Sequence, residues 1–198
     1  MTTATDYPDD RFDHLATERL IIRRFTQGDA ETFAAYRSDQ AVARYQSWDA
    51  PISLEQAREF IDSLQGNHPD TPGDWFQFAI AQKRAQAHIG DLALLADADN
   101  PRLATVGFTL SPSAQGQGYA TEALSALLDY LFLQRRKHRV QADCDTRNTA
   151  SARLLERVGM RREAHHLSSS FCMGEWTDEY VYAILSDEWQ RRSRPSLR

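Results

Sequence analysis

A glycine-containing turn between a strand pattern and a helical pattern carries the residue types best suited to binding an anion. The turn reads Gln115-Gly116-Gln117-Gly118-Tyr119-Ala120. Glycine permits positive φ and close backbone approaches, and the first N–H groups of the following helix have no partner within that helix. Together with the positive end of the helix dipole, these donors predict a binding site for a phosphate or a similar anion.

Hydrophobic periodicity on both sides of the turn predicts the elements that position it. In 105–110, Val106, Phe108 and Leu110 alternate with small or polar residues, which predicts a strand. After Gly118, apolar residues recur at three- and four-residue spacing, which predicts a helix with one buried face. These residues are Ala120, Ala123, Leu124, Leu127, Leu128 and Leu131.

Two familiar phosphate loops do not match the turn. A P-loop requires Gly-Lys followed by Ser or Thr, and a dinucleotide fingerprint starting at Gly116 requires glycine where Thr121 stands. The pattern Q-x-x-G-x-A, formed by Gln115, Gly118 and Ala120, instead resembles the pyrophosphate loop of the GNAT acetyltransferases, which bind acetyl-CoA. A plain strand–turn–helix junction is the alternative at this point.

A second motif strengthens the resemblance. The alternating run Arg139–Asp145 predicts the next strand, and a helix follows it from Asn148 to a glycine stop at Gly159. The motif N-x-x-S-x-x-L-L-E-x-x-G-M resembles the second cofactor-contacting motif of the GNAT superfamily. It consists of Asn148, Ser151, Leu154, Leu155, Glu156, Gly159 and Met160. Asn148 also suits a helix N-cap, and both roles are compatible.

The two ends of the chain resemble one branch of that superfamily. The closing pattern W-x-D-x-Y-x-Y (Trp176, Asp178, Tyr180 and Tyr182) and the opening phrase 17–23 are similar to the ribosomal-protein N-terminal (alanine/serine) acetyltransferases. The resemblance runs from about residue 15 to 189 with order and spacing intact.

This resemblance implies a fold and a domain organisation. We expect a layered α/β GNAT fold with a mixed, mostly antiparallel twisted sheet of six or seven strands. Its central pair would be parallel and splayed, and about four helices would flank the sheet. We expect one domain over 14–189, a flexible arm over 1–13 and a disordered basic tail over 190–198.

Composition narrows the class of protein. The 198 residues are 41% hydrophobic, enough to bury the core of one domain, and the net charge of −5 argues against nucleic acid as a partner. We find no apolar run of the length that spans a membrane and no signal-peptide pattern. Cys144 and Cys172 are too isolated for a disulfide framework or a zinc motif. A reduced cytoplasmic setting is therefore expected, without a bound metal.

The resemblance also assigns roles to residues. Backbone groups of Phe108, Thr109 and Leu110 would pair with the pantetheine arm of acetyl-CoA, Gln115–Ala120 would hold the pyrophosphate, and Asn148 would contact the arm. Many members carry a tyrosine as general acid where this chain has Leu155. Ser151, one helical turn earlier, is then the candidate donor to the leaving sulfur. No general base is assigned.

The expected reaction is direct transfer of an acetyl group to a primary amine. An α-amine, with a pKa of about 7.7–8.0 against about 10.4 for lysine, needs less help to lose its proton. Together with the family branch, this favours the N-terminal amine of a protein or peptide as acceptor. A small amine such as an antibiotic or metabolite, or a non-catalytic acyl-CoA-binding module, are the alternatives, and the oligomeric state (monomer or homodimer) stays open.

Overall fold

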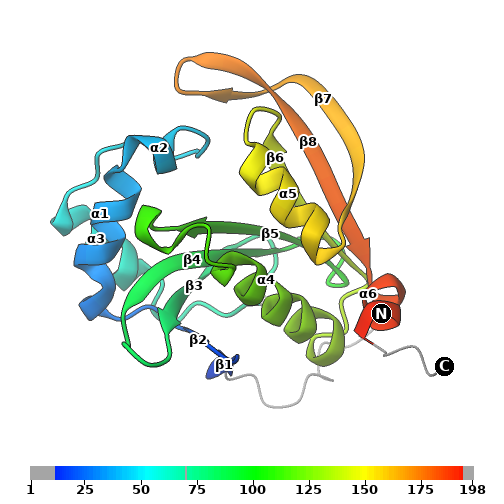
Figure 1. Ribbon diagram of the computed structural model, residues 1–198, viewed down its shortest axis with the longest axis horizontal. Coiled ribbons are helices and arrows are strands. Elements are labelled where there is room, and N and C mark those ends of the chain that lie inside the picture. Colours follow the sequence, from blue (N-terminus) through cyan, green and yellow to red (C-terminus); the bar gives the residue numbers. More distant parts are fainter. Residues whose placement is uncertain (1–11, 70, 194–198) are drawn as a thin grey trace.

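A twisted sheet of eight strands, in the order β1-β2-β3-β4-β5-β6-β8-β7, organises the chain (Figure 1). The computed structural model describes residues 12–69 and 71–193. Every neighbouring pair of strands is antiparallel except β5 and β6, which are parallel. The strands are β1 His14–Ala16, β2 Leu20–Arg23, β3 Trp75–Gln82, β4 His88–Ala96, β5 Leu103–Leu110, β6 Arg139–Asp145, β7 Arg161–Cys172 and β8 Glu175–Leu185.

The mixed, mostly antiparallel sheet with one parallel pair is confirmed, but it has more strands than the six or seven expected. The additional strand is β1, whose three residues are too few to produce a period-2 pattern. Phe12, just before β1, is buried against Phe76, Phe78 and Tyr130, although the sequence placed it in the flexible arm. The rest of that predicted arm, 1–11, lies outside the described residues.

Six α-helices lie in the described part of the chain, against about four expected. The two that the sequence did not reveal are short: α2 has four residues, and α6 is a polar segment that includes residues 190–193 of the predicted tail. Residues 194–198 lie outside the described residues. The helices are α1 Ala30–Ser38, α2 Gln40–Ala43, α3 Leu54–Ser63, α4 Tyr119–Asp129, α5 Thr149–Val158 and α6 Ser186–Ser193, with α4 extended by a π-helical turn, Tyr130–Gln134.

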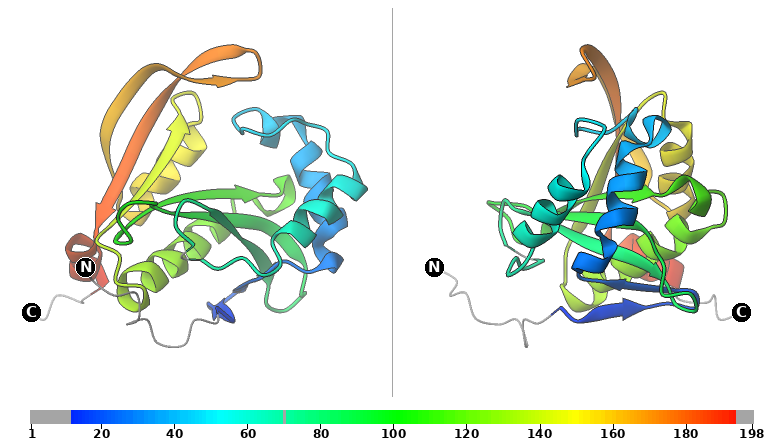
Figure 2. Two further views of the ribbon diagram at one scale, coloured as in Figure 1. Left: turned by 180° about the vertical axis from the view of Figure 1, so that it is seen from behind. Right: turned by 90° about the vertical axis from the view of Figure 1, so that its left-hand side faces the viewer.

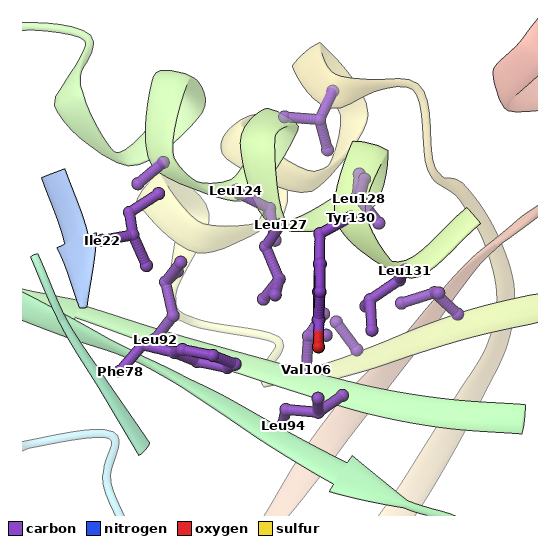
Figure 3. Packing of buried hydrophobic residues seen from close by; sticks show 14 of the residues in the cluster. Ile22, Phe78, Leu92, Leu94, Val106, Leu124, Leu127, Leu128, Tyr130 and Leu131 are labelled. Atoms are coloured by element: carbon purple, nitrogen blue, oxygen red, sulfur yellow. The ribbon is translucent and has the colours of Figure 1, made fainter. Parts of the chain in front are cut away.

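Helices cover both faces of the sheet (Figure 2). On one face the apolar side of α4 packs against β3, β4 and β5, with Leu124 and Leu127 fully buried above Leu92 and Leu94 (Figure 3). On the other face, α1 and α3 form a second apolar cluster that includes Phe33. The three-residue and four-residue spacing predicted for α4 is therefore the pattern of a buried helical face.

The parallel pair β5–β6 separates after a short stretch of pairing. It is joined only from Leu103↔Arg139 to Thr105↔Gln141, whereas β5 stays paired with β4 up to Leu110. From Val106 onwards, the edge of β5 that faces β6 has no strand partner. This opening at the centre of the sheet positions the candidate site.

Gly90 on β4 allows the close contact that holds β5 at this opening. A Cβ atom at Gly90 would lie 2.2 Å from the carbonyl oxygen of Thr109, which no side chain could tolerate. A register irregularity follows between Ile80 and Ala81, and the Ser111 N–H donates to the Ile89 carbonyl over 2.9 Å. The last residues of β5 are thus fixed by backbone contacts to β4.

The strands β7 and β8 form a long hairpin that extends beyond the body of the molecule (Figure 1). Near its tip, the Cys172 thiol donates to the Gln46 carbonyl over 3.1 Å, and Glu175 accepts from Arg147 over 2.7 Å. The hairpin therefore reaches the segment after α2, on the far side of the opening. None of the helices in the described residues is long and apolar enough to cross a membrane.

Candidate active site

A cleft of about 530 Å³ lies where β5 and β6 separate. The end of β5, the start of α4, one face of α5, and α2 with the residues after it surround the cleft. The lining residues are Ala41, Val42, Tyr45, Gln46, Phe108, Thr109, Leu110, Ala114, Gln115, Gly116, Gly118, Tyr119, Ala120, Thr121, Asn148, Ala150, Ser151, Arg153, Leu154 and Arg157.

The N-terminus of α4 opens into this cleft without a side-chain cap. Gly118, at the N-cap position, has φ of +81°, a left-handed conformation that glycine adopts without strain. The first intrahelical bond is made by Glu122, whose N–H donates to the Gly118 carbonyl over 3.1 Å. The N–H groups before it are the free donors that an anion at a helix N-terminus would use.

Side chains of the turn support its shape. The Gln115 amide donates to the Leu110 carbonyl over 3.0 Å, and the Gln117 amide donates to the Ser113 carbonyl over 2.7 Å. Arg19 then donates from Nη1 to the Gln117 carbonyl over 2.9 Å. Gln115 therefore holds the turn to the end of β5, and Gln117 holds it to the short turn that follows β5.

Glu122, in the first turn of α4, anchors that helix to the start of the chain. Its carboxylate accepts from the Thr17 hydroxyl over 2.6 Å, and from the Arg19 backbone N–H and Nε over 2.8 and 2.6 Å. Burial alone raises the pKa of the Glu122 carboxyl, but these hydrogen bonds outweigh burial and hold the pKa below its ordinary value. Glu122 is thus an ionised structural group rather than a proton donor.

Helix α5 places two of the predicted site residues in the cleft. The Asn148 side chain caps the helix, because its Oδ1 accepts from the Ser151 N–H over 3.1 Å. The Asn148 amide nitrogen and the Ser151 hydroxyl have no hydrogen-bond partner among the described residues. Leu155, which stands where the family resemblance implied a tyrosine acid, is fully buried in the core.

The charge of the lining differs from that of the whole chain. The net charge of the chain is −5, yet the lining contains no aspartate or glutamate and includes Arg153 and Arg157. A cleft with this lining, next to a helix N-terminus, attracts anions.

Most of the predicted cofactor-binding residues meet in the cleft. Phe108, Thr109, Leu110, Gln115, Gly116, Gly118, Tyr119, Ala120 and Asn148 line it, together with the predicted catalytic Ser151. Gln117 does not, because its side chain turns to Ser113 and its carbonyl to Arg19. Sequence reasoning missed Arg153 and Arg157, whose four-residue spacing on α5 was the available signal. It also missed the contribution of α2, which has no periodic pattern to reveal it.

The family model described as an acetyltransferase (GNAT) domain matches residues 19–161. The chain belongs to the GNAT acetyltransferase family. Consistent with membership, an uncharacterized N-acetyltransferase of Bacillus subtilis, YnaD, is 31% identical over 176 residues, which cover 89% of this chain and 99% of that protein. The chain is accordingly an acyltransferase of the N-acetyltransferase type.

Two further comparisons place the chain within the GNAT family. A crystal structure of a GNAT acetyltransferase from Bacillus anthracis has a TM-score of 0.78 and 30% identity, covering 88% of this chain and 99% of that one. The [ribosomal protein uS5]-alanine N-acetyltransferase of Escherichia coli is 29% identical over 84 residues, which cover 42% of this chain and 43% of that protein. The predicted resemblance to GNAT and to its ribosomal-protein branch is confirmed.

The GNAT family uses acetyl-CoA, and the cleft has the donors that this molecule requires. Its phosphates fit the free N–H groups at the start of α4 and the positive charge of the lining. Within the described part of the chain, no group of three or more histidine, cysteine, aspartate or glutamate side chains could hold a metal ion.

Carboxylates gather on the sheet face opposite α5. Asp145 and Glu179 face each other across β6 and β8, and Asp143 lies two residues before Asp145 on the same face. Partial desolvation and the charge of Glu179 raise the pKa of the Asp143 carboxyl above its ordinary value. Asp145 behaves differently, because the hydrogen bonds from Arg147 lower its pKa. Asp143 is therefore the better proton acceptor of the two.

Proposed function

We propose that this chain transfers the acetyl group of acetyl-CoA directly to the α-amine at the N-terminus of a protein or peptide. One observation carries the proposal. The open edge of β5 has an anion-attracting cleft beside it, formed by the start of α4 and by α5, while carboxylates that attract amines lie on the other face of β6.

Different residues of the cleft bind different parts of acetyl-CoA. The N–H groups after Gly118 bind the pyrophosphate, and the backbone of Phe108, Thr109 and Leu110 pairs with the pantetheine arm along the unpartnered edge of β5. The second amide atom of Asn148 is available for the same arm because Oδ1 is used for capping. When bound, acetyl-CoA supplies the activated acetyl group.

Ser151 is the candidate donor to the departing sulfur. Its hydroxyl lines the cleft and has no partner among the described residues. A serine hydroxyl is a weak acid, so its role is to donate a hydrogen bond rather than to transfer a full proton. Tyr182 does not replace the missing tyrosine acid, since burial and then Glu156, to which its hydroxyl donates, raise its pKa to about 12.

The carboxylates on β6 and β8 attract a protonated amine. A protonated amine is drawn to Asp143, Asp145 and Glu179, and must then lose its proton before attack. Asp143 is placed two residues beyond the last β5–β6 pair, and we assign it the role of proton acceptor, directly or through water. Because a carboxylate is a weak base, it deprotonates an amine of low pKa more readily. The α-amine is the common amine of this kind in proteins.

The relative named for uS5-alanine acetylation supports the same acceptor class, because it modifies a protein rather than a metabolite by its name. A small amine is the second candidate, since the carboxylate face attracts any amine cation.

A three-acceptor assay tests the proposal. Thiol release from saturating acetyl-CoA is measured at pH 7 with a peptide whose only amine is its N-terminus, the same peptide with a blocked N-terminus and one lysine, and a polyamine. We expect the α-amine peptide to react fastest, because roughly a tenth of it is neutral at pH 7 against about one part in a few thousand of a lysine. Faster reaction of the lysine peptide or the polyamine would replace the α-amine with that acceptor class.

A further inference from the structure

We infer that Arg153 and Arg157 of α5 hold the 3′-phosphate of coenzyme A and make this chain prefer CoA to dephospho-CoA. The inference rests on the proposed use of acetyl-CoA and adds a specificity-determining pair to it. Both arginines occupy unspecified positions of the second motif, so the resemblance assigned no role to them.

Both arginines line the cleft, on the side that faces the start of α4. They are four residues apart on α5, so their side chains lie one turn apart on the same face of the helix. Arg157 lies beside the first turn of α4, where its Nη1 is 3.4 Å from the Thr121 hydroxyl. The pair is therefore next to the N–H groups assigned to the pyrophosphate, on the opposite wall.

The guanidinium groups of Arg153 and Arg157 also differ from those of the arginines that are paired with carboxylates. Elsewhere in the described residues, ion pairs with carboxylates are formed by Arg19, Arg23, Arg37, Arg139, Arg147, Arg161 and Arg191. Arg153 and Arg157 form none within the described residues, and no carboxylate lines the cleft. Two like charges at this spacing destabilise the helix, and an anion bound between them would remove that repulsion.

The chemistry of CoA selects the 3′-phosphate as that anion. The pyrophosphate is matched by backbone N–H groups at the α4 N-terminus, which leaves the separate phosphate monoester on the ribose. A phosphate monoester carries a charge of about −1.5 to −2 at pH 7 and three acceptor oxygens. Two guanidinium groups, each able to donate two parallel hydrogen bonds, match this group in charge and in geometry.

A purely structural role for Arg153 and Arg157 predicts no preference for CoA over dephospho-CoA. Arg157 lies in the last turn of α5, where a positive charge favours the helix dipole. In that case CoA and dephospho-CoA, which share everything except the 3′-phosphate, would bind equally well.

Calorimetric titration with CoA and with dephospho-CoA distinguishes the phosphate-binding role of the arginines from a structural role. We expect the unaltered chain to bind CoA about tenfold more tightly or better, the equivalent of about 1.4 kcal/mol. The double variant Arg153→Gln, Arg157→Gln should lose this ratio while its affinity for dephospho-CoA is unchanged. Arg84→Gln, at an exposed position in the β3–β4 turn, is the matched control and should keep the ratio.

The outcomes separate this inference from the proposed function. Equal affinities in the unaltered chain, or a double variant that keeps the ratio, would overturn the role of the arginines and leave acetyl-CoA binding intact. Failure of the unaltered chain to bind either compound would overturn the proposed function itself. The ratio in the unaltered chain tests the inference even if the double variant does not fold.

Discussion

The Arg19 guanidinium and the Glu122 carboxylate form an ion pair, with 2.6 Å between Nε and Oε2. The same guanidinium donates to the Gln117 carbonyl and lies 4.5 Å from the centroid of the Tyr119 ring. Arg19, the residue just before β2, thus contacts three positions of the turn and helix assigned to the pyrophosphate. The opening phrase 17–23, whose sequence resembles one branch of the family, therefore also shapes the cleft.

Replacing Arg19 with glutamine should weaken CoA binding without unfolding the chain. The Arg19 side chain is 43% exposed, so the ion pair contributes at most about 1 kcal/mol, which corresponds to about a fivefold loss of affinity. Titration calorimetry of Arg19→Gln with CoA measures this loss of affinity, and Arg84→Gln is a control with the same change of charge. An unchanged affinity would show that the turn holds its shape without Arg19.

The contribution of Glu122 to stability should disappear in acid. Because its folded-state pKa lies below the unfolded value, the stabilisation is present above the unfolded pKa and is lost as pH falls through the folded pKa. Glu122→Gln should therefore be less stable than the parent at pH 6 to 8, with a difference that shrinks below about pH 4. Urea unfolding of both proteins across this pH range measures the difference in their free energies of unfolding. A difference that does not change with pH would contradict the prediction.

Gly118→Val should abolish CoA binding by placing a side chain at the N-terminus of α4. The substitution is also strained, because φ is +81°. Gly66→Val is the matched control, since Gly66 has φ of +84° and open space around the Cβ position. Both variants should lose similar stability, about 1–3 kcal/mol, in thermal unfolding, and only Gly118→Val should lose binding. Equal CoA affinities for the two would remove the turn from the phosphate site.

Asn148→Ala and Ser151→Ala should affect different steps. Loss of the Asn148 cap should cost about 0.5–2 kcal/mol of stability and also weaken CoA binding. Ser151→Ala should bind CoA almost normally and turn over more slowly, because a hydrogen bond to the leaving sulfur matters mainly in the transition state. Steady-state kinetics beside titration separates them, and parental turnover in Ser151→Ala would remove that role.

Asp143→Asn should lower turnover without changing CoA affinity. A general base acts in its ionised form, so activity should fall as pH drops through the raised pKa of Asp143. At pH 7 we expect a loss of about a hundredfold in kcat, at the low end for acid–base catalysis, with Asp99→Asn in an exposed loop as control. A pH–rate profile that is the same in both variants would leave proton removal to solvent.

The amino-acid sequence by itself determined the local elements of the site. The Gly118 turn, the helix after it, the Asn148 cap and the Gly159 stop follow from periodicity and end residues within about ten positions, because φ preferences and capping bonds are local. The order of strand β5, helix α4 and strand β6 along the chain also favours parallel pairing through one crossover, and β5 and β6 pair in parallel.

Only the tertiary structure decided which distant residues meet. Thr17 and Arg19 reach Glu122 about a hundred positions away, and the carboxylates Asp143 and Glu179 meet because β8 pairs beside β6. Strand order, register and the end of β5–β6 pairing set these contacts, and they depend on how whole elements pack rather than on any local spacing. The same holds for Arg153 and Arg157. Their four-residue spacing indicates a shared helix face, but only the packing of α5 shows that this face lines the cleft.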